Sequence, residues 1–233
     1  MKYAVILGDG MADLPEACPG GRTPLELART PVLDRLCGGG ETGLVRTVPE
    51  GMAPGSDTAN LSILGYEGKR YYRGRASLEA LALGICLGVH DLAFRCDLTG
   101  LSGAGPAFEE LQMGAPWALA GKEEEACMSV KEVMGKESGL SLVPGRNGKC
   151  LLLWKDGLLK SPGLMNDAAG GCGLVPPHEM AGKRIGDFLP EQRTLRKFSE
   201  DSYLALRARF PRERACFWLC GAGTACELPD FSE

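Results

Sequence analysis

The segment Gly51–Tyr66 constrains this chain more than any other, because it places a serine between a glycine turn and an apolar helical run. Ser56 follows Gly55 directly, and the residues after it are spaced as in a helix. The first N–H groups of a helix have no partner within the helix, and the helix dipole favours negative charge there. A hydroxyl at this position can cap the helix or act as a nucleophile toward an anion. Asp57 or Thr58 could cap the helix instead, so the sequence leaves both roles of Ser56 open.

The opening of the chain also carries a candidate functional residue. Residues 4–7 are apolar and predict a buried strand, and a Gly-Asp-Gly turn containing Asp9 follows them. Such a turn is common after any strand. A carboxylate just beyond a first strand is nevertheless where open α/β sheets bind ligands, and its oxygens suit divalent metal ions. A dinucleotide fingerprint is disfavoured, because Asp13 occupies its third glycine position.

Composition narrows the possible classes of protein. A chain of 233 residues with 44% apolar content can bury a core in one or two domains. The net charge of −4 and the lack of basic runs argue against nucleic-acid binding. No apolar stretch is long enough to span a membrane. Ten cysteines without a C-x-x-C pair favour reduced thiols in a cytoplasmic protein, and the early first strand leaves no room for a signal peptide.

Hydrophobic periodicity divides the chain into two kinds of pattern. The first 90 residues alternate strands and helices, which predicts a parallel α/β sheet. The predicted elements there are strands at Tyr3–Leu7 and Gly43–Val48 and helices at Thr23–Gly38, Asp57–Leu64 and Ser77–Leu87.

From about residue 91 the pattern predicts a compact α+β unit, a Gly/Pro-rich linker and a final helix and strand. These elements are strands at Leu92–Leu98 and Lys149–Lys155, a helix at Lys122–Gly135, the linker Asn166–Pro177, a helix at Pro190–Arg209 and a strand at Cys216–Cys220.

Several segments together resemble the archaeal-type cofactor-independent (2,3-bisphosphoglycerate-independent) phosphoglycerate mutases of the alkaline phosphatase superfamily. They occur in the order of that family and are Ile6–Asp13, Gly55–Tyr66, Tyr71–Ala80, Asp91–Arg95, Pro176–Lys183 and Phe217–Gly223. The resemblance is strong over the first 95 residues and loose between about 97 and 175. It implies an alkaline-phosphatase-like parallel sheet core with an inserted smaller α+β substrate domain. The implied boundaries are residues 1–90 for the first part of the core, 91–185 for the insert and 186–233 for the return to the core.

The resemblance also implies catalytic roles. Ser56 would take the phosphoryl group as a phosphoserine and return it to the other glycerate hydroxyl, interconverting 2- and 3-phosphoglycerate. Asp9 would hold one of two divalent metal ions (Mn, Mg or Zn), and Ser56 would be a further ligand. A metal ion lowers the pKa of a bound hydroxyl and neutralises charge on the transferring group. The protein would thus be a glycolytic isomerase acting on a small phosphorylated acid.

Arginines are natural partners for a substrate that carries phosphate and carboxylate groups, because the guanidinium binds both in a bidentate manner. Arg75 and Arg95 match family positions best, and Arg146 aligns loosely. His178 follows two prolines and is a further candidate for substrate contact. Asn60 lies one helical turn after Ser56, so we expect it on the same face of the helix.

One departure from the family pattern affects the metal site. The remaining metal ligands of the superfamily are Asp and His residues in the C-terminal part of the core. This chain has only two histidines, His90 and His178, and neither lies in such a pattern. The chain thus carries half of a two-metal site, and we expect a fragment, a split protein or a degenerate one. Two alternatives to a mutase stay open at this point. One is a related phosphotransferase with another small substrate such as homoserine, and the other is an inactive remnant that binds phosphorylated acids.

Overall fold

A computed structural model describes residues 4–116, 118–135, 139–145, 148–165 and 173–229. It divides the chain into two compact units, Met1–Arg46 and Thr47–Glu233. Each unit is considered by itself below. The boundaries suggested by the family resemblance, near residues 90 and 185, stay predictions.

Short helices make up the first unit. They are the 3-10 turns η1 (Pro15–Ala17) and η2 (Pro19–Gly21) and the α-helices α1 (Pro24–Leu27) and α2 (Pro31–Gly39). Thr23 caps α1 and forms a capping box with Glu26. The single helix predicted from Thr23 to Gly38 is wrong, because the chain leaves the helical conformation between α1 and α2. Pro31 explains the break, since a proline disfavours helical geometry at the residue before it.

The two predicted strands in the N-terminal region are not formed. Residues 4–7 and 43–48 have no strand geometry, and apolar side chains within them are exposed, with Ile6 at 87% and Val45 at 82%. A strand is stable only when its N–H and C=O groups pair with a neighbour, and no described segment pairs with either run. The predicted parallel sheet is therefore not present among the described residues, where all strand pairs are antiparallel.

The second unit is built around one five-stranded sheet. Its strands are β1 (Leu92–Ser102), β2 (Gln112–Pro116), β3 (Leu140–Pro144), β4 (Lys149–Trp154) and β5 (Ala215–Gly223). The order is β2-β1-β4-β3, and β5 also pairs with β1. The predicted strands at Leu92–Leu98, Lys149–Lys155 and Cys216–Cys220 are confirmed within β1, β4 and β5. The short strands β2 and β3 were missed.

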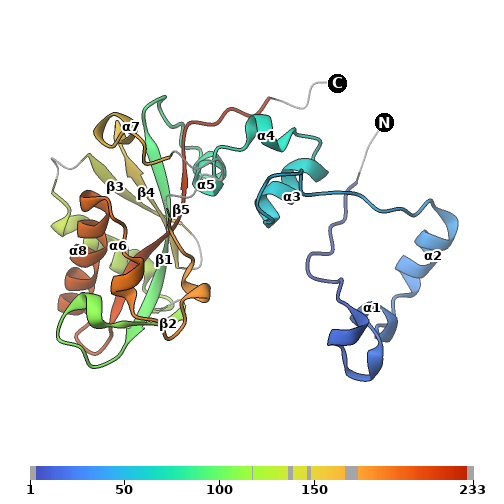
Figure 1. The fold of residues 1–233 in the computed structure, drawn as a ribbon, viewed down its shortest axis with the longest axis horizontal. Coiled ribbons are helices and arrows are strands. Elements are labelled where there is room, and N and C mark those ends of the chain that lie inside the picture. Colours follow the sequence, from blue (N-terminus) through green and yellow to red (C-terminus); the bar gives the residue numbers. More distant parts are fainter. Residues whose placement is uncertain (1–3, 117, 136–138, 146–147, 166–172, 230–233) are drawn as a thin grey trace. The chain divides into compact units, whose positions relative to one another are not determined.

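Helices lie on both faces of this sheet (Figure 1), so the fold is mixed α/β. Helices α6 (Glu123–Val133) and α8 (Arg193–Arg209) cover one face, and α5 (Arg75–Ala82) packs on the other. The remaining short helices are α3 (Ser56–Ile63), α4 (Gly68–Tyr71), α7 (Gly157–Lys160), η3 (Phe108–Glu110), η5 (Pro177–Glu179) and η6 (Ile185–Phe188).

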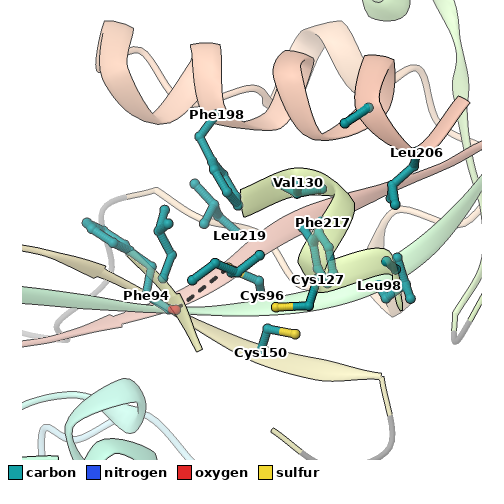
Figure 2. Packing of buried hydrophobic residues seen from close by; sticks show 14 of the residues in the cluster. Phe94, Cys96, Leu98, Cys127, Val130, Cys150, Phe198, Leu206, Phe217 and Leu219 are labelled. Carbon is teal, nitrogen blue, oxygen red and sulfur yellow. Dashed lines mark hydrogen bonds between the residues drawn. The ribbon is translucent and has the colours of Figure 1, made fainter. Parts of the chain in front are cut away.

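Strand alternation places the core on the α6/α8 face. Phe94, Cys96 and Leu98 of β1 are fully buried there, and Figure 2 shows them facing Phe198 and Val130 of the covering helices. The intervening residue Ala93 packs on the α5 face with Ala76 and Ala80 of that helix. β1 therefore contributes to clusters on both faces of the sheet, and the α5 face holds the smaller of these two.

The helix predictions hold in this unit to within about three residues, apart from one C-terminal boundary. The predicted helices at Asp57–Leu64, Lys122–Gly135 and Pro190–Arg209 correspond to α3, α6 and α8. The helix predicted to run to Leu87 ends at Ala82, because Gly84 takes a positive φ of 71° that terminates it. Among the described residues, no helix is both long and apolar enough to cross a membrane. Residues 166–172 of the predicted linker lie outside the described residues.

Candidate functional site

Ser56 occupies the first position of α3, and Gly55 is the capping residue before it. The Ser56 side chain is exposed, and its hydroxyl makes no hydrogen bond within the part of the chain that the structure describes. Thr58 is buried and donates its hydroxyl proton toward the carbonyl oxygens of Gly55 (2.9 Å) and Ala53 (3.2 Å). Thr58 therefore holds the turn, and the capping role considered for Ser56 is not observed.

A tyrosine ties α3 to the segment that leads into α5. The Tyr72 hydroxyl donates a hydrogen bond to Oδ2 of Asp57 at 2.6 Å. Burial raises the pKa of Tyr72, and the hydrogen bond to Asp57 raises it further, so the phenol stays protonated and remains a donor. The sequence analysis considered Asp57 only as a helix cap and did not single out Tyr72, although Tyr72 lies in one of the segments that carry the family resemblance.

The start of α5 is fixed against the end of β5. Gly74 has a φ of 98°, and a β-carbon there would overlap the carbonyl oxygen of Ala222. The Ser77 hydroxyl lies 2.8 Å from the carbonyl oxygen of Arg73 and 2.6 Å from that of Thr224. The backbone N–H of Thr224 donates to Arg73 at 3.0 Å. This junction sets the position of Arg75, the first residue of α5.

Two predicted substrate-binding arginines share one carboxylate. The Nε atoms of Arg75 and Arg95 lie 3.5 and 3.4 Å from the same Oε1 atom of Glu79. Arg95 also forms an ion pair with Asp97 at 3.2 Å, and its side chain is only 13% exposed. Burial acts to lower the pKa of Arg95, but Cys220, Asp97 and Glu79 outweigh it, so the net pKa is raised and the guanidinium stays charged.

These elements surround a cavity of about 320 Å³. Gly55 and Asp57, the neighbours of Ser56 on either side, line it together with Tyr72, Arg75 and Cys220. Arg95 does not line this cavity, but its backbone is close to it, since Cys220 donates to the Arg95 carbonyl oxygen at 3.6 Å. A cavity of this size suits a small ligand. The structure thus brings together the turn before α3, the start of α5 and the adjoining parts of β1 and β5.

The other predicted site residues are placed less closely. Asn60 is exposed on α3, one turn after Ser56. His178 lies in η5 with 76% of its side chain exposed, and its Nε2 atom is 3.9 Å from Glu179. It does not line the cavity, although Pro176 does. Arg146 lies outside the described residues.

Asp9 lies in an exposed turn of the first unit, so it is considered apart from the cavity of the second. Among the described residues, no group of three or more His, Cys, Asp or Glu side chains is close enough to hold a metal ion. Oxygen atoms of Asp9 and Ser56 are suitable ligands for manganese or magnesium, but two ligands do not complete a site. The residues described here therefore do not fit the two-metal centre that the family resemblance implies.

An exposed serine at a helix start, beside a cavity lined by arginine, is an arrangement suited to anionic phosphate esters. Residues 38–209 match the family model of 2,3-bisphosphoglycerate-independent phosphoglycerate mutase. The chain belongs to this family. Ser56, Arg75, Arg95 and His178 fall within the matched region, whereas Asp9 precedes it.

Relatives and solved structures carry the same description. A 2,3-bisphosphoglycerate-independent phosphoglycerate mutase of Methanothrix thermoacetophila is 39% identical over 253 residues, covering 100% of this chain and 58% of that protein. A probable mutase of Geobacter sulfurreducens is 36% identical over 247 residues with the same coverage. The cofactor-independent phosphoglycerate mutase structure from Thermoplasma acidophilum is 22% identical, with a TM-score of 0.46, covering 95% of this chain and 59% of that one. The chain therefore spans about 58% of the length of these relatives.

Proposed function

We propose that this chain carries the nucleophile and the substrate-binding arginines of a phosphoglycerate mutase. The observation that supports this most directly is the exposed hydroxyl of Ser56 at the start of α3, which has no hydrogen bond to any described residue and lies next to the cavity lined by Arg75. The proposal includes an alkaline-phosphatase-like core with an inserted substrate domain, with boundaries near residues 90 and 185. Its substrate is a small phosphorylated acid, 2- or 3-phosphoglycerate.

In the proposed reaction, the Ser56 oxygen forms a bond to phosphorus as the bond from phosphorus to the glycerate oxygen breaks. The serine proton leaves the hydroxyl, and the released glycerate hydroxyl gains a proton. Attack on the phosphoserine by the other glycerate hydroxyl reverses these changes and regenerates Ser56. Main-chain N–H groups at the start of α3 are oriented to stabilise the negative charge on the phosphoryl oxygens.

The arginine pair would bind the anionic groups of the substrate. Arg75 lines the cavity directly, and Arg95 is linked to it through Glu79. Glu79 and Asp97 neutralise the two guanidinium groups when no substrate is bound. A substrate carboxylate or phosphate would bind the terminal nitrogens of Arg75 or replace Glu79 as its partner. Asn60 would orient the phosphoryl group, and His178 would contact the substrate only if η5 approached the cavity.

A chimera tests the proposal. Residues 1–233 of this chain are joined to the C-terminal part of the Methanothrix relative that they do not cover, and the product is supplied with manganese and 3-phosphoglycerate. We expect 2-phosphoglycerate to form and phosphate to appear on the Ser56 peptide in mass spectra. Ser56→Ala should abolish both, whereas Ser62→Ala on the same helix should abolish neither.

A chimera that unfolds cooperatively and binds manganese, yet gives no phosphate on Ser56, would contradict the proposal. Phosphate on Ser56 without formation of 2-phosphoglycerate would keep the nucleophile but reject the mutase substrate. In that case L-homoserine is the next acceptor to offer, because its hydroxyl could receive the same phosphoryl group.

A further inference from the structure

The helix that carries Ser56 is joined to the segment leading into the helix of Arg75 by one side-chain hydrogen bond. The Tyr72 hydroxyl donates to Oδ2 of Asp57 at 2.6 Å. Among the described residues, no other hydrogen bond runs from α3 to α5 or to residues 72–74 before it. The position of the candidate nucleophile relative to the arginine therefore depends on this bond and on the packing of the two buried residues of α3.

Tyr72 extends from a part of the chain that is held at several points. Its N–H donates to the carbonyl oxygen of Gly68 at 2.8 Å, which closes the end of α4. The next residue, Arg73, accepts a hydrogen bond from the N–H of Thr224 at 3.0 Å, and its carbonyl oxygen lies 2.8 Å from the Ser77 hydroxyl. The tyrosine is therefore anchored to the end of β5 through its own backbone.

Asp57 passes this restraint to the turn before Ser56. Its Oδ1 atom lies so close to Gly55 that a β-carbon on that glycine would overlap it. Asp57 is also in the first turn of α3, where the helix dipole favours a carboxylate. Tyr72 is the hydrogen-bond donor found for this carboxylate among the described residues. Because the Asp57 side chain lies against the turn, fixing its direction also restricts the backbone on both sides of Ser56.

The same pair affects the charge of the cavity. Asp57, Tyr72 and Arg75 all line it. A carboxylate that turned freely into this space would repel an anionic substrate, because like charges at short range oppose each other. The hydrogen bond from Tyr72 occupies one of the two Asp57 oxygens and gives the carboxylate a defined direction.

We propose that Tyr72 is a positioning residue for phosphoryl transfer, which acts through Asp57 to hold the Ser56 hydroxyl at a fixed place relative to Arg75. This inference rests on the proposed function. Substrate binding depends on the arginines, whereas attack depends on the distance from the serine oxygen to phosphorus. A misplacement of about 1 Å can reduce a rate about 100-fold. Loss of the hydrogen bond should therefore lower kcat and leave KM nearly unchanged.

Tyr72→Phe in the chimera described above tests this role, because it removes the hydroxyl and keeps the ring. With manganese and 3-phosphoglycerate, we expect kcat to fall at least about tenfold and KM to change by less than about threefold. Tyr71→Phe is the matched control. Tyr71 is the neighbouring residue, its ring packs against Tyr66, and its hydroxyl has no hydrogen bond within the described part of the chain. This variant should keep both constants of the wild-type chimera.

Two changes at Asp57 separate action through this carboxylate from a general effect on folding. Asp57→Asn keeps a side-chain oxygen that can accept the hydrogen bond of Tyr72, so it should lose far less kcat than Asp57→Ala. Asp57→Ala should lose about as much as Tyr72→Phe, and the double variant should lose no more than either single one, because both changes remove the same interaction. Losses that multiply in the double variant would overturn the proposal.

Amide hydrogen exchange on the 233-residue chain itself gives a readout that does not need mutase activity. The N–H of Ala59 donates to the Gly55 carbonyl oxygen at 3.0 Å, the first hydrogen bond of α3. Tyr72→Phe should speed exchange of this N–H at least about tenfold and leave the amides of α8 unchanged. Tyr71→Phe should change neither. Unchanged exchange at Ala59 in Tyr72→Phe would overturn the proposal.

The kinetic outcomes distinguish this inference from the function on which it rests. If the wild-type chimera forms 2-phosphoglycerate and Tyr72→Phe has the same kcat, this inference is overturned and the proposed function stands. A higher KM with an unchanged kcat also overturns it, because Tyr72 would then act on binding and not on the position of Ser56. A folded wild-type chimera that forms no phosphoserine overturns the proposed function, and this inference with it.

Discussion

Replacing Gly74 by alanine tests the junction that positions the candidate site. Gly74 has φ 98° and ψ 155°, a region that is essentially restricted to glycine. An alanine there costs about 2 kcal/mol of backbone strain. Its β-carbon would also overlap the Ala222 carbonyl oxygen and lie 2.8 Å from the Cα atom of Gly223. Relieving that overlap costs about another 2 kcal/mol, as overpacking does elsewhere.

Gly84→Ala is the matched control. Gly84 also has a positive φ, of 71°, but a β-carbon there would meet no atom within 4 Å. This variant carries only the backbone strain, about 1 kcal/mol. Both substitutions reduce the entropy of the unfolded chain equally, so that effect cancels in the comparison. The expected difference in the free energy of unfolding between the two variants is therefore about 3 kcal/mol.

Equilibrium urea unfolding measures both variants, followed by circular dichroism and by tryptophan fluorescence, to which Trp218 on β5 contributes. In thermal unfolding followed by the same two signals, the melting temperature should fall by about 8–16 °C for Gly74→Ala and about 2–4 °C for Gly84→Ala, given about 2–4 °C per kcal/mol for a chain of this size. Equal losses for the two variants would refute a close approach between α5 and β5. The positions of Arg75 and Tyr72 would then need another explanation.

Three further predictions follow from single residues. Ser56→Ala should change the free energy of unfolding by less than about 0.5 kcal/mol in urea titrations, because the exposed hydroxyl caps nothing; a loss above 1 kcal/mol would assign it a structural role. Asp91 accepts hydrogen bonds from the N–H groups of Asp156 and Gly88, both 2.9 Å. The Asp156 bond is the main cause of its lowered pKa. The stability that this carboxylate contributes is thus complete above its unfolded pKa of about 3.9 and lost as the pH falls through the lower folded pKa. Asp91→Asn should accordingly be about 1.5 kcal/mol less stable than the wild type at pH 6, and the difference should shrink as the pH falls below about 3.9; a difference independent of pH would contradict this assignment. Dithionitrobenzoate should modify the exposed Cys37 rapidly and Cys216 only on unfolding, because burial removes access and raises the pKa of the Cys216 thiol to about 12. Peptide mass spectra taken over time measure the order of modification, and early modification of Cys216 in the folded protein would contradict this prediction.

The sequence predicted most accurately those elements whose local apolar pattern agrees with the burial of their side chains in the structure. The apolar runs of β1 and β4 and the 3.6-residue periodicity of α8 find partners within the second unit, so their local signal and their burial agree. The apolar run at residues 4–7 has the same local signal but remains exposed. A strand depends on a hydrogen-bonding neighbour as well as on its own residues, and that neighbour cannot be read from the strand itself.

The candidate site shows the same limit at the level of single side chains. The motifs around Ser56 and Arg75 made both of them candidates, and Gly55 and Asp57, the neighbours of Ser56, line one cavity with Arg75. The hydrogen bond between Tyr72 and Asp57 could not be predicted from the sequence, because it joins residues 15 positions apart through the packing of two helices. The shared carboxylate of Glu79 was missed for a related reason. On α5 it looks like an ordinary i,i+4 partner of Arg75, and only the sheet brings Arg95 to it.

Glu79 in turn determines how much positive charge the site can present to a substrate. Its Oε1 atom lies at nearly the same distance from the Nε atoms of Arg75 and Arg95, so the two arginines share this oxygen as an ion-pair partner. Arg95 keeps Asp97 as a second partner, whereas the only ion pair of Arg75 among the described residues is with Glu79. Under the proposed function, an incoming anion would displace Glu79 most readily from Arg75, which is also the more exposed arginine and the one that lines the cavity. In the proposed complex, Arg95 would then retain both carboxylates, and its buried charge would stay compensated while Arg75 binds the substrate.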